Sequence, residues 1–267
     1  MISNPNNPTI RQIRKLRKRR ERDKRRQLIV EGHRSLSVAI HAKADVSKVL
    51  HTPSATTKRS ELLQDARERG ASIHEVSPAV MASLTSVETA PDVLGVATMP
   101  GCTLEQAVSR LSFGAVLAGV RDPATAGSIL SSCAAAGGGV AIATAGTTDL
   151  FAPKPVRSAS GAHFLLSIAP GVDPEACADA LRGAGVRMVA LEPDGGDLAD
   201  ADLGGKIAIV VGEEGALPKA LADAADARVA AGSGPGGIRP SVGAEAAVVL
   251  FEAARRRGAA RTKRGDA

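Results

Sequence analysis

The chain has 267 residues, of which 44% are hydrophobic, so it can bury the core of one large domain or two smaller ones. No stretch approaches 18 uninterrupted apolar residues, and the N-terminus is polar and then basic, so we expect no membrane span and no secretory signal. The three cysteines, Cys102, Cys133 and Cys177, lack metal-ligand spacing and cannot all pair. Their pattern favours a reduced, cytoplasmic setting without a metal site.

The net charge of +6 is concentrated at the two ends of the chain. Residues 1–26 have a net charge of +9 and residues 255–267 a net charge of +5, whereas residues 27–254 are acidic with a net charge of −8. Basic ends on an acidic body predict local contacts with nucleic-acid phosphates. The chain has four Phe and no Trp or Tyr, which argues against an aromatic platform for stacking bases.

The basic N-terminal segment, residues 1–26, has the composition of a helix with sparse apolar positions at Ile13 and Leu16. A helix that is basic all round should not pack deeply, so the segment is interpreted either as a solvated, partly disordered arm or as an RNA-contacting helix. Both interpretations hold if the arm orders on binding. The candidate phosphate contacts are Arg14, Lys15, Arg17, Lys18, Arg19, Arg20 and Lys24.

Residues 27–100 alternate between strand and helix patterns. Strands are expected at residues 28–32, 46–50 and 93–97, and helices at residues 35–42 and 61–69, with a further short helix after Pro78. Pro100-Gly101 is typical of the start of a linker. These signals predict a small α/β domain.

The pattern restarts after Phe113. Strands are expected at residues 115–120, 140–143, 164–168, 187–191 and 207–211, and helices at residues 128–136, 174–183 and 244–255, with Lys154 and Arg157 in a loop. Strands that alternate with helices predict a parallel sheet. The glycine-rich residues 232–237 indicate a flexible loop.

The apolar strand at residues 207–211 organises this second domain. It stops at Gly212, and Pro218 suits the first turn of a helix through Lys219 and Leu221. Ligands of open α/β sheets bind at the carboxyl ends of the strands, so residues 212–217 are a candidate ligand loop.

Four segments then match, in order, the motifs of one known family. Residues 120–133 (VRDPATAGSILSSC) resemble D-P-x-N-x-G-x-x-x-R-T-A, and residues 149–162 (DLFAPKPVRSASGA) resemble D-x-x-x-P-K-x-x-R-A-S-x-G-A. Residues 211–218 (VGEEGALP) are similar to G-x-E-G-x-G-L-P with one residue fewer, and residues 239–253 (RPSVGAEAAVVLFEA) to S-L-N-V-S-V-A-A-A-V-L-L-F-E-A. The chain thus resembles the SpoU (TrmH-like) RNA ribose 2′-O-methyltransferases of the SPOUT superfamily.

The resemblance implies a methyltransferase domain at residues 112–258 with a C-terminal trefoil knot, a homodimer assembled through that domain, and a basic tail at residues 259–267. It also implies that the preceding α/β domain binds the RNA substrate, rRNA or tRNA. S-adenosyl-L-methionine (SAM) would be the cofactor, held by Gly127, Val211, Gly212, Glu214, Gly215, Leu217, Ile238 and Val242. The motif positions assigned to catalysis are Glu214, Ser131, Ser241 and Thr125, and Lys154 and Arg157 would contact RNA.

Several polar residues of the family motifs are replaced in this chain. The first-motif arginine and asparagine are Ser131 and Thr125, and the third motif carries Ser241 for asparagine, Gly243 for serine and Glu245 for alanine. A serine is neither a cation nor a competent base unless another group activates it. Glu245 would cap a helix, pair with a basic residue or place a charge in the pocket.

Two hypotheses follow from these replacements. One is a working methyltransferase in which Arg121, Arg157 or Arg239 replaces the missing arginine. The other is a protein that binds RNA or a partner with little SAM binding or methyl transfer. An unrelated nucleotide-binding α/β protein is a remote third, because neither G-x-G-x-x-G nor a P-loop is present.

Overall fold

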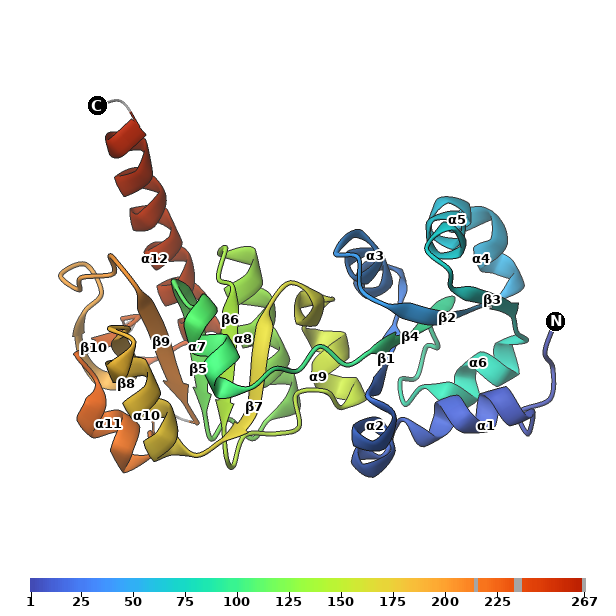
Figure 1. Ribbon diagram of the computed structural model, residues 1–267, viewed down its shortest axis with the longest axis horizontal. Helices are drawn as coiled ribbons and strands as arrows, with labels where there is room; N and C mark the ends of the chain where they lie inside the picture. The colour runs from blue at the N-terminus through green and yellow to red at the C-terminus, as the bar shows by residue number, and fades with distance from the viewer. Residues whose placement is uncertain (214–215, 233–236, 266–267) are drawn as a thin grey trace. The chain divides into compact units, whose positions relative to one another are not determined.

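The computed structural model describes residues 1–213, 216–232 and 237–265, with side chains up to residue 258. The chain divides into two compact units, each folded around its own sheet (Figure 1): Met1–Pro100 with Phe151–Phe164, and Gly101–Leu150 with Leu165–Ala267. We call these the N-terminal unit and the C-terminal unit. The elements of the N-terminal unit are α1 (Pro8–Lys15), α2 (Arg19–Arg25), β1 (Gln27–Glu31), α3 (His33–His41), β2 (Val46–His51), α4 (Pro53–Lys58), α5 (Ser60–Glu68), β3 (Ser72–Glu75), α6 (Pro78–Leu84), β4 (Val93–Thr98), α9 (Pro153–Ser158) and the 3-10 turn η1 (Ala162–Phe164).

The N-terminal unit contains a mixed four-stranded sheet in the order β1-β4-β2-β3. Strand β4 pairs antiparallel with both β1 and β2, and β2 pairs parallel with β3. Parallel pairing requires a crossover, which α4 and α5 supply between β2 and β3. The α/β character expected for this region is therefore present, with the extra strand β3.

The basic N-terminal segment packs against this sheet. Ile10, Ile13 and Leu16 are buried and belong to the same core cluster as Leu50 and Met81. Three apolar residues at helical spacing are enough to form a buried stripe, while the charged side chains occupy the other face. The expectation of a solvated, partly disordered arm that cannot pack deeply is therefore wrong.

Arg22 of α2 caps the C-terminal end of α1, the first helix of this segment. Its side chain is buried, and Nη1 donates to the carbonyl oxygens of Leu16 and Arg17, each at 2.9 Å. Carbonyls at the end of a helix have no partner within the helix, so the guanidinium satisfies groups that would otherwise be desolvated. One cation of the basic segment thus has a structural role.

Residues 151–164 also depart from expectation. They form α9 and η1 rather than a loop, and they cluster with the N-terminal unit. Pro153 occupies the first turn of α9, a position that proline favours. Gly161 has φ +92°, and a Cβ there would lie 2.6 Å from Val38 Cβ on α3, so this segment docks with no room for a side chain.

The C-terminal unit confirms the expected parallel sheet. Its six strands lie in the order β10-β8-β9-β5-β6-β7, and every pairing is parallel. The elements of this unit are α7 (Leu104–Arg110), β5 (Phe113–Ala118), α8 (Pro123–Ala135), β6 (Val140–Thr144), β7 (Ser167–Val172), α10 (Pro174–Gly183), β8 (Arg187–Asp197), β9 (Ile207–Gly212), α11 (Lys219–Ala224), β10 (Ala227–Ala230) and α12 (Val242–Gly265).

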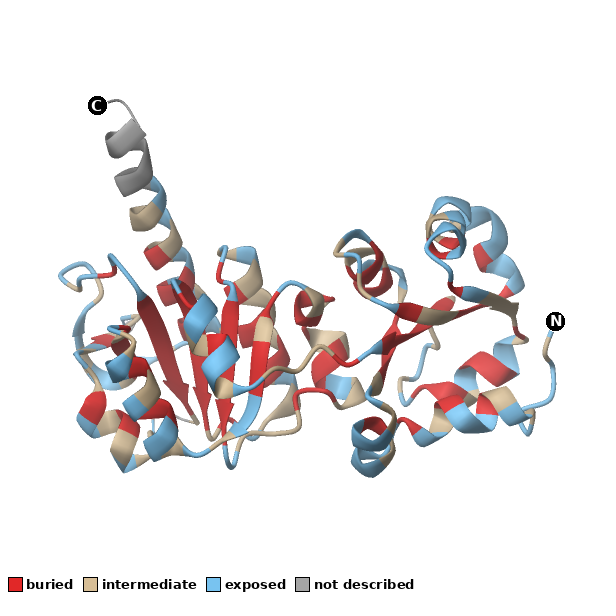
Figure 2. Cartoon of the chain, in the orientation of Figure 1, coloured by how far each residue is buried: buried red, intermediate tan, exposed pale blue. Residues whose placement is uncertain are grey.

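Burial follows the pattern that a covered parallel sheet requires. All residues of β5, β6 and β9 are buried, whereas the helices around them carry exposed residues on their outer faces (Figure 2). Strand β7 starts at Ser167 rather than at residue 164, because η1 extends to Phe164. The short edge strand β10 was not expected from the sequence. None of the helices in the described ranges is long and apolar enough to cross a membrane.

The cysteines provide a test of this packing. Burial raises the pKa of Cys133 and of Cys177 to about 12, so both remain protonated at pH 8, where only a thiolate reacts readily. We expect iodoacetamide at pH 8 to modify Cys102, which is partly exposed, well before the other two, as followed by peptide mass spectrometry. The same protein unfolded in urea, in which all three should react together, is the control. Equal labelling of all three in the folded protein would contradict the buried positions.

Gly161 provides a test of the docked segment. We expect Gly161→Ala to lower the midpoint of thermal unfolding by roughly 4 °C or more, because the methyl group would clash with Val38 and the backbone has a positive φ. Gly139→Ala is the matched control, since that position has ordinary φ and no atom within 4 Å of an added Cβ. A melting curve for Gly161→Ala that overlays the control would show that the segment does not pack as described.

Candidate functional site

The first motif lies at the carboxyl edge of the six-stranded sheet of the C-terminal unit, at the end of β5. The Gly119 amide donates to the hydroxyl oxygens of Thr144 and Thr147, each at 3.1 Å. Asp122 then caps α8 by accepting from the Thr125 amide at 2.7 Å. The cap explains why this motif begins with aspartate, since a side-chain oxygen at the N-cap satisfies a free amide of the first turn.

The second motif makes a tight turn at the end of β9. The Ala216 amide donates to the Glu213 carbonyl at 2.8 Å, so the chain folds back onto Gly212. A Cβ at Gly212 would lie 2.8 Å from the carbonyl carbon of Ala216 and 2.8 Å from Leu217 Cδ2. Only glycine fits there. The Glu213 carboxylate accepts from the Arg121 amide, which joins the second motif to the first.

The third motif starts α12 directly against the first. The Ser241 carbonyl accepts from the amides of Ala244 and Glu245, at 2.8 and 2.9 Å. A Cβ at Gly243 would lie 2.6 Å from Ser128 Oγ and 3.8 Å from Thr125 Cγ2 of α8. The family's serine at this position would therefore require Ser128 to move, and the replacement by glycine lets the two helices approach closely.

Glu245 pairs with Arg239. Arg239 Nε and Nη2 both donate to Glu245 Oε1, at 3.0 and 2.7 Å, and the glutamate side chain is only 7% exposed. Of the three possibilities for Glu245, pairing with a basic residue is correct. A buried carboxylate requires such a partner, so the arginine that precedes the helix is committed to this contact.

A pocket of about 530 Å³ opens at the carboxyl ends of β8 and β10. The register between these strands breaks after Arg228, where the pairing passes from Ala190 to Gly196, and residues 192–195 have no partner in either neighbouring strand. A Cβ at Gly195 would lie 2.7 Å from the Val229 backbone, so this close crossing also requires glycine. The pocket lining is Pro193, Asp194, Gly195, Gly196, Asp197, Leu198, Ala230, Ala231, Gly232, Gly237 and Arg239.

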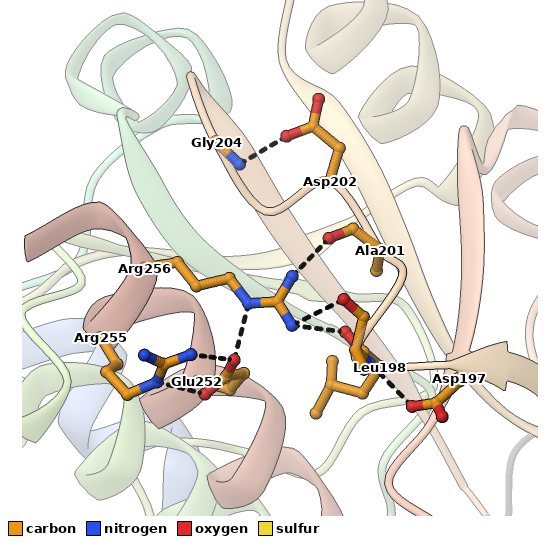
Figure 3. Close-up of polar contacts among 9 residues, drawn as sticks. Asp197, Leu198, Ala201, Asp202, Gly204, Glu252, Arg255 and Arg256 are labelled. Carbon is orange, nitrogen blue, oxygen red and sulfur yellow. Dashed lines mark hydrogen bonds and ion pairs between the residues drawn. The ribbon is translucent and has the colours of Figure 1, made fainter. Parts of the chain in front are cut away.

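Arg256 of α12 holds the loop that forms one wall of this pocket (Figure 3). It donates from Nη1 to the Ala201 carbonyl at 2.8 Å and from Nη2 to the carbonyls of Leu198 and Ala199, at 2.8 and 3.1 Å. Glu252 receives Arg256 Nε at 2.6 Å and both Nε and Nη2 of Arg255 at 2.8 Å. Hydrogen bonds from Arg255 and then Arg256 lower the pKa of Glu252 to about 2, so the carboxylate stays charged.

The structure brings some of the predicted cofactor and catalytic residues together in two groups. Gly212 and Leu217 lie together in the second-motif turn, and Thr125 lies beside the start of α12, where Ser241 and Val242 are found. Glu214 and Gly215 lie outside the described residues. The remaining members are a buried Gly127 and a half-buried Ser131 on α8, a buried Val211 at the end of β9, and Ile238, which is 74% exposed beside the pocket.

The predicted RNA contacts are not equivalent. Arg14 is partly buried and donates to the Pro5 carbonyl and the Ser83 hydroxyl, at 3.0 and 2.9 Å, and Arg157 pairs with Glu31 at 3.1 Å. Arg19 forms a loose pair with Asp23 at 3.6 Å. The exposed members are Lys15, Arg17, Lys18, Arg19, Arg20, Lys24 and Lys154.

The pocket wall and the residues that hold it were not predicted from the sequence. The succession Pro193-Asp-Gly-Gly196 after a strand pattern is a turn signal that indicates a break in the ladder. No local signal identifies the role of Arg256 in holding the wall, because the carbonyl groups to which it donates there are more than fifty residues away.

Comparisons with known proteins agree with this geometry. Residues 7–95 match the MRM3-like substrate binding domain, and residues 112–231 match the SpoU rRNA Methylase family. The chain is 27% identical over 195 residues to the 23S rRNA (guanosine(2553)-2'-O)-methyltransferase RlmP of Bacillus subtilis, covering 72% of this chain and 74% of the relative. It is 28% identical over 160 residues to rRNA methyltransferase 3B, mitochondrial, of Danio rerio, covering 56% and 34%.

Two solved structures share the fold over nearly the whole chain. The SpoU methyltransferase AviRb from Streptomyces viridochromogenes in complex with AdoMet has a TM-score of 0.81 at 26% identity, covering 95% of this chain and 100% of that one. The AdoMet-bound rRNA methyltransferase from Sinorhizobium meliloti has a TM-score of 0.82 at 24% identity, covering 96% and 97%. Residues 112–231, which contain the six-stranded sheet (the methylase sheet), therefore form a SpoU-type methylase domain, and residues 7–95 form an MRM3-like substrate-binding domain ahead of it.

Proposed function

We propose that this SpoU-family protein uses SAM to methylate a ribose 2′-hydroxyl of rRNA. The observation that carries the proposal is the carboxyl edge of the methylase sheet, where three motifs fold against one another beside a glycine-walled pocket. RlmP, a relative over most of the chain, is named as a 2′-O-methyltransferase, and AviRb is named as a complex with AdoMet.

The pocket suits a ligand of the size and charge of SAM. Its volume of about 530 Å³ is within the range of small-molecule sites, and four glycines leave backbone groups accessible along its walls. Asp194 and Asp197 give it acidic groups, which complement the sulfonium and ammonium cations of SAM. When bound, the cofactor supplies an electrophilic methyl group.

The protein's own task is then to align the ribose hydroxyl and to accept its proton. Alignment depends on rigid backbone, which the turn at Gly212 and the contact of Gly243 with α8 provide. Proton removal requires a base near the hydroxyl, and Thr125, Ser131 and Ser241 supply only neutral hydroxyl groups. Glu214 is the acidic candidate that the motifs retain.

One observation favours the second hypothesis, a protein that binds RNA with little methyl transfer. Arg239, a candidate replacement for the missing arginine, is held by the buried Glu245 carboxylate. Arg157, another candidate, pairs with Glu31 in the N-terminal unit. Of the three arginines considered, Arg121 remains, and its side chain is exposed.

The two hypotheses are separated by restoring the family residues. We expect the wild type to bind SAM and to transfer methyl groups slowly to rRNA. The double variant with Ser131→Arg and Ser241→Asn should raise single-turnover methyl incorporation by about 10²-fold, which is the typical contribution of one catalytic acid–base group. Calorimetry with SAM and radiolabelled SAM with unmodified rRNA provide the two measurements.

The matched control for this experiment is Ala135→Arg, which adds a cation to an exposed position one turn further along α8. Wild-type protein that neither binds SAM nor gains methyl transfer in the restored variant would disprove the proposed reaction and favour the second hypothesis. Ordinary rates of methyl transfer in the wild type would show instead that another residue supplies the positive charge of the missing arginine.

We also propose that the exposed face of the basic segment binds RNA phosphates. Replacing Lys15, Lys18 and Arg20 by Gln should reduce the slope of log affinity against log salt by about 0.7–0.9 for each phosphate that the protein no longer neutralises. The control replaces Lys58, Arg67 and Arg69, which are equally exposed on α4, α5 and the residue after α5. An identical slope for the two triple variants, measured by fluorescence anisotropy with rRNA fragments, would remove this face from the RNA-binding surface.

A further inference from the structure

The N-terminal unit contains a second pocket, of about 540 Å³, that no motif predicts. The first turn of α3, the connection between α6 and β4, and the end of α9 surround it, and all three belong to the N-terminal unit. Most of its exposed lining surface is apolar, to which Val87 and Pro91 contribute, and charged side chains such as Glu31, Glu88 and Arg157 also line it. This combination is typical of a ligand site.

Glu31 is the buried polar group of this pocket. The residue is 6% exposed, and its Oε2 accepts from the Thr85 hydroxyl at 2.9 Å and from Arg157 Nη1 at 3.1 Å. Its Oε1 has no hydrogen-bond partner among the described residues. This oxygen is not fully enclosed by the protein, so it is open to the pocket and provides an acceptor for a ligand.

Arg157 provides donors beside this acceptor. Its Nη1 is used by Glu31, while Nε and Nη2 have no partner within the described part of the chain, and a third of its side chain is exposed. A carboxylate acceptor and guanidinium donors therefore lie next to each other at the pocket. Each RNA base has an N–H donor next to a carbonyl or ring-nitrogen acceptor on its Watson–Crick edge, which is the complementary arrangement.

The start of α3 adds a site for a negative charge. The helix follows Gly32 at φ 84° and has no side-chain cap. Amide groups of an uncapped first turn and the helix dipole attract phosphate, and the exposed Arg34 at the same pocket adds a full positive charge.

We propose that this pocket receives one unpaired nucleotide of the RNA substrate. The base would hydrogen-bond to Glu31 and Arg157 between the apolar walls, and its phosphate would lie at the first turn of α3. The inference rests on the proposed RNA-binding function, and it gives Arg157 a specific role in place of a general charge contact.

Filling the pocket tests the proposal. In the full-length protein without SAM, Val87→Trp should weaken binding of fluorescein-labelled single-stranded RNA pentanucleotides by about tenfold, the change that corresponds to 1.4 kcal/mol. Ser86→Trp is the matched control, because Ser86 is the exposed neighbour and does not line the pocket. Glu31→Gln should change the relative affinities for the four homopolymers, which a purely structural role for Glu31 would leave unchanged.

Photo-crosslinking identifies the occupied surface independently. With pentanucleotides that contain 4-thiouridine, crosslinks should fall in peptides that include residues 31–35 or 87–91 of the wild type and disappear in Val87→Trp. Crosslinks confined to the basic N-terminal segment, equal RNA affinities of the two Trp variants, or protection of the pocket by an acidic peptide but not by RNA would overturn the proposal. RNA binding at the pocket without methyl transfer would refute only the proposed reaction, and methyl transfer that Val87→Trp does not affect would refute only the pocket.

Discussion

Backbone segments approach one another at the carboxyl edge of the methylase sheet more closely than any side chain permits. Gly212 lies against the Ala216 carbonyl group, Gly243 against α8, and Gly195 against the Val229 backbone. Glycine is the residue that allows such contacts, since any Cβ would force one of the segments away. The positions of the three motifs and the shape of the pocket all depend on this constraint, so the site is built mainly from backbone.

This backbone construction explains how the third motif differs from the family pattern while retaining packed structure. Glycine at 243 removes the serine side chain and brings α12 against α8, and Glu245 enters the buried face of α12 with Arg239 as its partner. A buried carboxylate without a partner would be strongly destabilising, so Glu245 depends on Arg239 at this position.

The parts that were predictable from the sequence are those in which the local pattern decides the structure. Apolar runs such as residues 207–211 identify buried parallel strands, and Gly212 marks the end of one. The buried face of α1 was missed because Ile10, Ile13 and Leu16 are few among many charges, and three apolar residues suffice when a sheet lies beneath them. The Glu245–Arg239 pair and the register break between β8 and β10 depend on tertiary contacts, which no local pattern contains.

The segment at residues 151–164 shows where motif order and physical units diverge. Its motif lies within the stretch that matches the methylase family, yet its contacts place it in the N-terminal unit. Four apolar residues of this segment are buried there: Pro155, Val156, Ala159 and Ala162. A protein that lacked residues 1–111 would therefore expose these side chains, and Gly161 would lose its contact with α3. The methylase part of the sequence thus supplies a wall, and through Arg157 a charged group, to the unit that resembles a substrate-binding domain. The two units are therefore interleaved in the sequence, because one segment within the stretch that matches the methylase family completes a pocket of the N-terminal unit.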